Sequence, residues 1–259
     1  MEAPLPEGPI LIVIEDATGS GKTEAADYIA HRLIAAGCGE GLYVGLPTMA
    51  TADQAYLRRK DLRSKLFISP VDMVLAHSGA ATRSIFRVSA ERGDVIAGEA
   101  ESIDWFARSS KQALLATIGV GTVDQALLAG LRAKFAMVRL TGLLGKVLVV
   151  DEVHAYDAYM QAILQKVVEA HARYGGSVVL LSATLPSCQR AALVNPFLRG
   201  IAVADAVVGD IDALDARVFP SLTVAHPRAV SVVPVKARYG PGSRPIAKAP
   251  QPSAPSRPM

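Results

Sequence analysis

Long hydrophobic runs and cysteines are both scarce in this sequence of 259 residues. The longest apolar run near the start, Ile10–Ile14, is far shorter than the roughly 20 residues that a membrane-spanning helix needs. The first residues also do not show the pattern of a secretory signal, which is a basic region followed by an apolar region and a small-residue cleavage site. Cys38 and Cys188 are too few for a disulfide framework and lack metal-ligand spacing. We therefore expect a cytoplasmic protein with no membrane partner.

Charge is nearly balanced along the chain, but it is unevenly distributed. The net charge is +3, and six basic residues with no acidic residue lie from Arg228 onward, so residues 1–227 carry −3. With 51% hydrophobic and 20% charged residues, the chain can bury a sizeable core. These values exclude a strongly basic body, and any nucleic acid must bind to a local patch.

Segments that are apolar throughout alternate with segments of helical periodicity, which predicts a mostly parallel α/β sheet with helices on both faces. The expected strands are 9–14, 42–46, 73–76, 113–118, 146–150 and 177–181, and the expected helices are 22–36, 49–60, 123–131 and 156–174. Residues 78–111 are predicted to form an insertion or long loop with some helix.

The sequence predicts one main domain over residues 1–200. Residues 201–240 are an extension that either folds onto the sheet or hangs from it. Residues 241–259 are rich in Pro, Ser and Ala, a composition that cannot sustain a core, so we expect a disordered tail.

A glycine-rich segment between the first expected strand and helix carries the first chemical signal. It reads Thr18-Gly19-Ser20-Gly21-Lys22-Thr23, which is typical of a phosphate-binding loop. Glycines let the backbone amides point at phosphate oxygens, Lys22 would reach the β- and γ-phosphates, and the Thr23 hydroxyl would ligate Mg²⁺. The full pattern has Gly at its first position, where this chain has Asp16. The alternative is an ordinary Gly/Ser turn.

Two further polar segments follow expected strands. Asp151-Glu152-Val153-His154 comes directly after 146–150, so Asp151 can hold Mg²⁺ through a water and Glu152 can orient or deprotonate the attacking water. We expect this strand to lie beside the strand that precedes the loop. The alternative is a helix-capping box. Ser182-Ala183-Thr184 can link the nucleotide site to another surface, although such a sequence is also common in turns.

Taken in this order, GSGKT, DEVH and SAT resemble motifs I, II and III of a superfamily 2 helicase. The segment LPTMATA at 46–52 resembles motif Ia, GTVDQALL at 121–128 resembles the segment before the DEVH strand, and DEVHAYDAYM spans 151–160. Over residues 9–200 this set is similar to the CRISPR-associated helicase of type I interference systems.

The resemblance implies the first of two RecA-like P-loop domains, with ATP and Mg²⁺ as cofactors. Family members couple ATP hydrolysis to movement along single-stranded DNA after recruitment by an RNA-guided CRISPR surveillance complex. It implies that Thr18–Thr23 bind ATP, that Lys22, Asp151 and Glu152 are catalytic, and that Thr23 and Asp151 hold the metal. It also implies coupling roles for His154, Ser182 and Thr184, and DNA contacts by Thr48, Gly121, Thr122 and Gln125.

The resemblance stops at the first RecA-like domain. No HD dyad appears and no arginine-finger motif precedes the Pro-rich tail, so we expect the second RecA-like domain and the HD nuclease on a separate chain or missing. Because arginine fingers contribute about 10³–10⁵ in rate, the isolated chain is expected to hydrolyse ATP poorly. The alternatives are a catalytically silent nucleotide-binding module and a truncated fragment. A cluster of basic residues is predicted to be a solvated helix face, and the alternative is that it adds charge for DNA binding; it consists of Arg58, Arg59, Lys60, Arg63 and Lys65.

Overall fold

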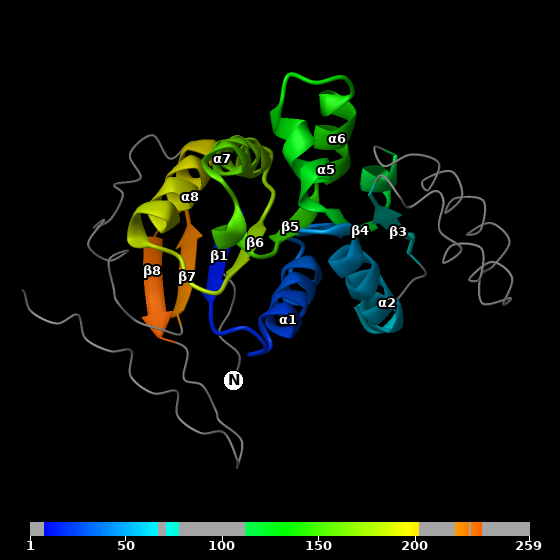
Figure 1. The fold of residues 1–259 in the computed structure, drawn as a ribbon, viewed down its shortest axis with the longest axis horizontal. Coiled ribbons are helices and arrows are strands. Elements are labelled where there is room, and N and C mark those ends of the chain that lie inside the picture. Colours follow the sequence, from blue (N-terminus) through cyan, green and yellow to red (C-terminus); the bar gives the residue numbers. More distant parts are fainter. Residues whose placement is uncertain (1–7, 67–70, 78–111, 202–220, 228, 235–259) are drawn as a thin grey trace, which may run out of the picture.

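The computed structural model describes residues 8–66, 71–77, 112–201, 221–227 and 229–234 (Figure 1). These residues form an eight-stranded sheet in the order β3-β4-β2-β5-β6-β1-β7-β8. The strands are β1 (Leu11–Glu15), β2 (Gly41–Leu46), β3 (Met73–Ala76), β4 (Ile118–Thr122), β5 (Lys146–Val150), β6 (Val178–Ser182), β7 (Ser221–His226) and β8 (Ala229–Pro234).

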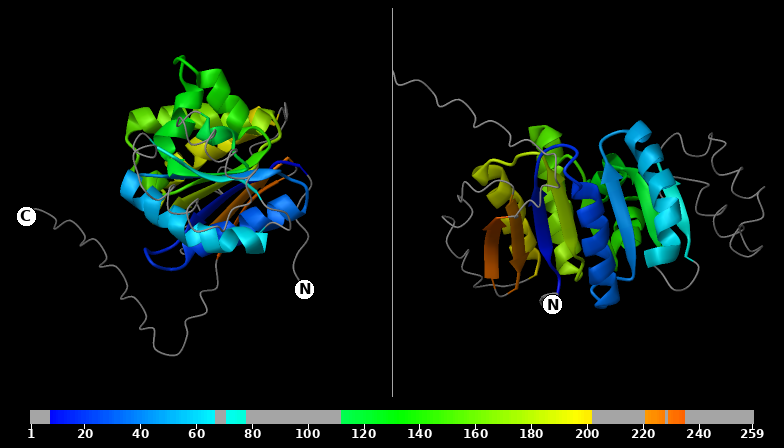
Figure 2. Two further views of the ribbon diagram at one scale, coloured as in Figure 1. Left: turned by 90° about the vertical axis from the view of Figure 1, so that its right-hand side faces the viewer. Right: turned by 90° about the horizontal axis from the view of Figure 1, so that it is seen from below.

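Helices cover both faces of the sheet. The α-helices are α1 (Lys22–Ala35), α2 (Met49–Leu66), α5 (Val123–Leu127), α6 (Ala136–Leu143), α7 (Ala158–Arg173) and α8 (Ser187–Gly200), and short 3-10 turns occupy η2 (Ala113–Leu115), η3 (Leu128–Gly130) and η4 (Val153–Ala155). Helices α1 and α2 lie on one face, and α5 to α8 lie on the other (Figure 2). In the described residues, no helix has the length and apolar character needed to cross a membrane.

The six strands from β3 to β1 run parallel and are buried on both faces, which explains why their sequences are largely apolar. Alternation along β1 divides the core in two. Ile12 and Ile14 pack with Ala26, Ala30 and Leu33 of α1, whereas Leu11 and Val13 belong to the cluster on the opposite face. The predicted fold class is therefore confirmed.

The prediction of a strand over residues 113–118 is wrong. Residues Ala113–Leu115 form a 3-10 turn, and β4 begins at Ile118. The strand includes Gly119, where a Cβ atom would lie 2.7 Å from Cδ2 of the Tyr43 ring. Glycine normally weakens a strand, but here close packing requires it. Helices α6 and α8 were also missed.

The expectation that the strand carrying Asp151 lies beside β1 is also wrong, because β6 lies between β1 and β5. The carboxyl ends of these parallel strands still meet at one edge of the sheet. The sequence did not decide whether the extension after residue 200 folds onto the sheet. Its residues 221–234 join the sheet, since β7 pairs antiparallel with β1, and β8 pairs with β7. Residues 78–111 and 241–259 lie outside the described residues.

Candidate functional site

The loop between β1 and α1 has the backbone geometry of an anion-binding turn. Gly19 and Gly21 have φ angles of 79° and 93°, in the left-handed region that favours glycine. Helix α1 begins at Lys22, and no side chain caps its first turn at Gly21. The amides at such a helix start have no carbonyl partner within the helix, so they can donate to an anion.

The Lys22 side chain is buried within this loop. Its Nζ donates to the carbonyl oxygens of Asp16, at 2.7 Å, and Ala17, at 2.8 Å. The carboxylate of Asp16, at the position where the motif has Gly, accepts from the Ala17 amide at 2.7 Å. The departure from the motif is thus accommodated in the loop, and the lysine ammonium is held at the cavity.

The acidic pair Asp151 and Glu152 follows β5 in a constrained turn. The Glu152 amide donates to Asp151 Oδ1 at 2.9 Å, and the Tyr156 hydroxyl donates to the Asp151 carbonyl at 2.7 Å. Glu152 has a φ angle of 53°, which is unusual for a residue with a side chain. Burial raises the pKa of the Asp151 carboxyl above its ordinary value. Non-glycine residues in such a backbone conformation cluster at functional sites.

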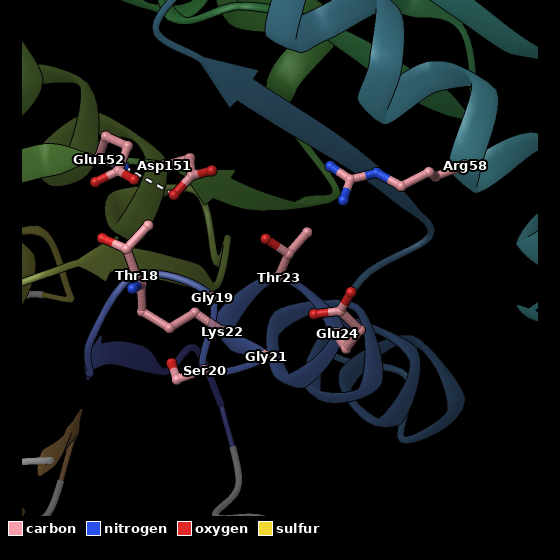
Figure 3. Close-up of a pocket in the computed structure, with 10 residues that line it drawn as sticks. All are labelled: Thr18, Gly19, Ser20, Gly21, Lys22, Thr23, Glu24, Arg58, Asp151 and Glu152. Atoms are coloured by element: carbon pink, nitrogen blue, oxygen red, sulfur yellow. Dashed lines mark hydrogen bonds between the residues drawn. The ribbon is translucent and has the colours of Figure 1, made fainter. Parts of the chain in front are cut away.

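One cavity of about 490 Å³ brings these two segments together (Figure 3). It is lined by Thr18, Gly19, Ser20, Gly21, Lys22, Thr23, Glu24, Arg58, Asp151 and Glu152. Thus every residue predicted for the phosphate loop lies in the same cavity as the acidic pair. Glu24 and Arg58 were missed. Glu24 adjoins the motif directly, whereas no local signal distinguishes Arg58 from its basic neighbours.

The DEVH and SAT segments contact each other next to this cavity. The amide of Ala183 donates to His154 Nδ1 at 3.3 Å, and the same nitrogen lies 3.3 Å from Glu152 Oε2. A neutral ring nitrogen cannot accept from Ala183 and donate to Glu152 at the same time, so the tautomer selects one of these contacts. The Ser182 hydroxyl donates to the carbonyl of Thr184 at 3.0 Å. His154 therefore lies within reach of both Glu152 and the loop after β6, and it can bond to either one.

Comparison with known proteins identifies the family. The model of the DEAD/DEAH box helicase family matches residues 6–191. The chain belongs to the DEAD/DEAH box helicase family. Within this family it is similar to the CRISPR-associated endonuclease/helicase Cas3 of Escherichia coli K12, with 41% identity over 197 residues, which are 74% of this chain and 22% of the relative. The Cas3 of Thermus thermophilus is 43% identical over 195 residues, 72% of this chain and 21% of the relative.

Solved structures give the same result. The crystal structure of T. fusca Cas3-ATP matches with a TM-score of 0.74 and 36% identity, covering 87% of this chain and 25% of the other. The structure of T. fusca Cas3-ADP matches with a TM-score of 0.73 and 37% identity at the same coverage. The resemblance to CRISPR-associated helicases is confirmed. This DEAD/DEAH box helicase chain spans about a quarter or less of the length of the relatives it matches.

The residues expected to contact DNA lie outside the cavity of this DEAD/DEAH box helicase. Thr48 follows β2, and Thr122 ends the neighbouring strand β4, so both lie at the carboxyl edge of the sheet. Of the four expected residues, Thr48 is the exposed one, and its hydroxyl lies 2.9 Å from that of Thr51. Gly121, Thr122 and Gln125 are buried.

The donor set in the helicase cavity fits a nucleotide with Mg²⁺. Loop amides and the Lys22 ammonium are donors that suit phosphate oxygens, and the Thr23 hydroxyl and Asp151 carboxylate offer the hard oxygen atoms that Mg²⁺ prefers. In the described ranges, no group of three or more His, Cys, Asp or Glu side chains could hold a metal alone. The donor set would therefore fit a metal whose other ligands are phosphate oxygens.

Proposed function

We propose that this chain supplies the ATP-binding half of an ATP-dependent helicase or translocase that acts on single-stranded DNA in type I CRISPR interference. The observation that carries the proposal is the single cavity shared by the phosphate loop Thr18–Thr23 and the acidic pair Asp151 and Glu152. Family membership supports ATP-dependent helicase chemistry, and similarity to Cas3 supports the CRISPR context.

In this proposal the two sides of the cavity have different roles. Residues Thr18–Gly21 and Lys22 bind the phosphates, while Thr23 and Asp151 hold the Mg²⁺. When bound there, Mg²⁺ would supply charge neutralisation for the phosphate oxygens. Glu152 orients the attacking water and accepts its proton, and the turn that follows β5 places its carboxylate at the cavity.

Coupling between ATP and DNA would use the contacts of His154 next to the cavity. The contact between His154 and Ala183 joins the segment that carries Glu152 to the segment that contains Ser182 and Thr184. We place the DNA path at the carboxyl edge of the sheet, beginning at exposed Thr48. The other three expected residues are buried, namely Gly121, Thr122 and Gln125. DNA would therefore contact them only if the groups that cover them moved.

The proposed partners beyond DNA are an RNA-guided surveillance complex and a chain that carries the second RecA-like domain, the HD nuclease or both. A solved structure described as a CRISPR RNA-guided surveillance complex, pre-nicking, matches this chain with a TM-score of 0.64 and 34% identity over 87% of its length. Because no arginine-finger motif is found in the sequence, we expect weak ATP hydrolysis by this chain alone.

The first test measures nucleotide binding by the Lys22→Ala variant, with a fluorescent ATP analogue and Mg²⁺. A charge-assisted hydrogen bond contributes about 1.5–3 kcal/mol, so Kd should rise about ten- to hundredfold. Lys166→Ala, which removes an exposed lysine of α7, is the matched control and should bind normally. Equal affinity in the Lys22→Ala variant and the parent would refute the nucleotide assignment.

The second test distinguishes half of a motor from a silent binding module. The chain is mixed with a separately produced second RecA-like domain from a similar Cas3, and ATP hydrolysis is measured with and without single-stranded DNA. We expect DNA-stimulated hydrolysis that disappears in a Glu152→Gln chain. Binding of ATP with no hydrolysis in this mixture would favour the silent module instead.

A further inference from the structure

The charges around the cavity raise a question that the phosphate-loop motif does not answer. Among its lining residues, Glu24, Asp151 and Glu152 are acidic, and Lys22 and Arg58 are the cations. The Lys22 ammonium already donates to two loop carbonyls. Without Arg58, a polyanion would enter a cavity in which three carboxylates face one lysine.

Arg58 belongs to this cavity although it comes from a different element. It lies on α2, and its guanidinium reaches from that helix towards the side of the cavity where Thr23 and Asp151 lie (Figure 3). Its side chain is exposed, and within the described part of the chain it has no ion-pair partner. The group is therefore available to a ligand.

The neighbouring residue fixes the position of Arg58. Arg59 is buried and donates from Nε, at 2.9 Å, and Nη2, at 2.8 Å, to Asp27 Oδ1 on α1. Helix α1 begins at Lys22, so this ion pair ties the turn of α2 that carries Arg58 to the helix that starts at the phosphate loop. Successive helix residues point about 100° apart, which lets Arg59 face α1 while Arg58 faces the cavity.

We propose that Arg58 is a second phosphate-binding cation of the nucleotide site, supplied within this domain by α2. The inference rests on the proposed function and assigns to Arg58 a ligand, the oligophosphate of a nucleoside di- or triphosphate. A guanidinium suits this role because its planar fork can donate two parallel hydrogen bonds to phosphate oxygens. The predicted basic cluster is then not a uniform solvated face, since Arg58 lines the cavity and Arg59 pairs with Asp27 where α2 packs on α1.

The test measures Kd for a fluorescent ATP analogue with Mg²⁺ in the full chain and in Arg58→Ala. Inorganic triphosphate is then used as a competitor to separate phosphate contacts from base contacts. We expect Arg58→Ala to raise the Kd of both the analogue and the triphosphate by about tenfold. The Kd of Arg58→Lys should lie between those of Arg58→Ala and the parent. Arg132→Ala, which removes an exposed arginine outside the cavity, should match the parent.

Three outcomes would overturn the assignment. If Lys22→Ala loses nucleotide and Arg58→Ala does not, Arg58 is only a surface residue and the proposed function still stands. If Arg58→Ala weakens binding of the analogue but leaves the affinity for triphosphate unchanged, Arg58 contacts the base or sugar and not the phosphates. If neither variant changes binding, the nucleotide site itself is refuted.

Discussion

A buried ion pair next to the phosphate loop offers a quantitative test of this structure. Glu15, the last residue of β1, accepts hydrogen bonds from Arg190 Nε at 2.9 Å, from the Leu185 amide at 2.8 Å and from the Ser221 hydroxyl at 3.1 Å, and Arg190 Nη2 lies at 2.7 Å. One carboxylate thus joins β1, α8, the loop after β6 and β7. Replacing Arg190 with Leu removes the charged partner from this network.

The expected cost follows from the burial of both side chains. Their exposed fractions are 4% for Glu15 and 6% for Arg190, so the remaining carboxylate cannot be solvated in place. Removal of one partner from a buried pair typically costs about 3–5 kcal/mol. Because Leu185 and Ser221 still donate to Glu15, we expect about 3 kcal/mol for Arg190→Leu, a large part of a total stability of about 5–15 kcal/mol.

An exposed pair in the same chain provides the control. Arg199 lies 3.1 Å from Glu169, and their exposed fractions are 60% and 28%. Such a pair contributes about 0–1 kcal/mol, so Arg199→Leu should be nearly neutral. Both variants of the full chain are unfolded in urea and followed by far-UV circular dichroism, which reports the free energy of unfolding.

The double variant Glu15→Leu with Arg190→Leu completes the design. It leaves no unpaired buried charge, so it should recover part of the stability lost in Arg190→Leu. The reasoning would be refuted if Arg190→Leu lost less than about 1 kcal/mol, or no more than Arg199→Leu, since the carboxylate would then be solvated or dispensable.

Three further changes test separate parts of the fold, each by urea unfolding. Burial lowers the pKa of Lys146 from its ordinary 10.5 to about 7, so the unfolded chain binds more protons than the folded chain between these pH values. The free energy of unfolding should therefore rise with pH in this range, and Lys146→Met should lose that rise. Parallel pH profiles of the parent and the variant would contradict the predicted shift. Gly119→Ala should cost about 1–3 kcal/mol because its Cβ would meet the Tyr43 ring, and a neutral effect would show that the ring can move. Asp157→Ala should cost about 1 kcal/mol because its carboxylate caps α7 by accepting from the Met160 amide, whereas Asp157→Asn should retain the cap.

The sequence predicted those parts of the site that depend on neighbours along the chain. The loop Thr18–Thr23 was found because glycines, a lysine and a flanking strand and helix are all local features. The acidic pair was found because it ends an uninterrupted apolar strand. Their meeting in one cavity follows from a general rule, since parallel strands place their carboxyl ends at the same edge of the sheet.

Other features depended on residues far apart in the chain. The predicted strand 113–118 stopped before Gly119 and Gly121, and only the structure placed the Tyr43 ring and the Ala76 carbonyl beside them. The pattern of residues 221–234 was too short to predict whether they join the sheet, and antiparallel pairing with β1 decides that they do. Arg58 and Arg59 are chemically identical, and only the packing of α2 on α1 turns Arg59 to Asp27 and Arg58 to the cavity.

By itself, therefore, the sequence determined most of the alternation of strands and helices, the glycine-rich turn and the acidic pair, because each is encoded within a few consecutive positions. The tertiary structure alone decided that β6 separates β1 from β5, that Glu15 pairs with Arg190, and that one of two adjacent arginines enters the cavity. These outcomes depend on which elements pack together and at what rotation, and no local periodicity specifies either.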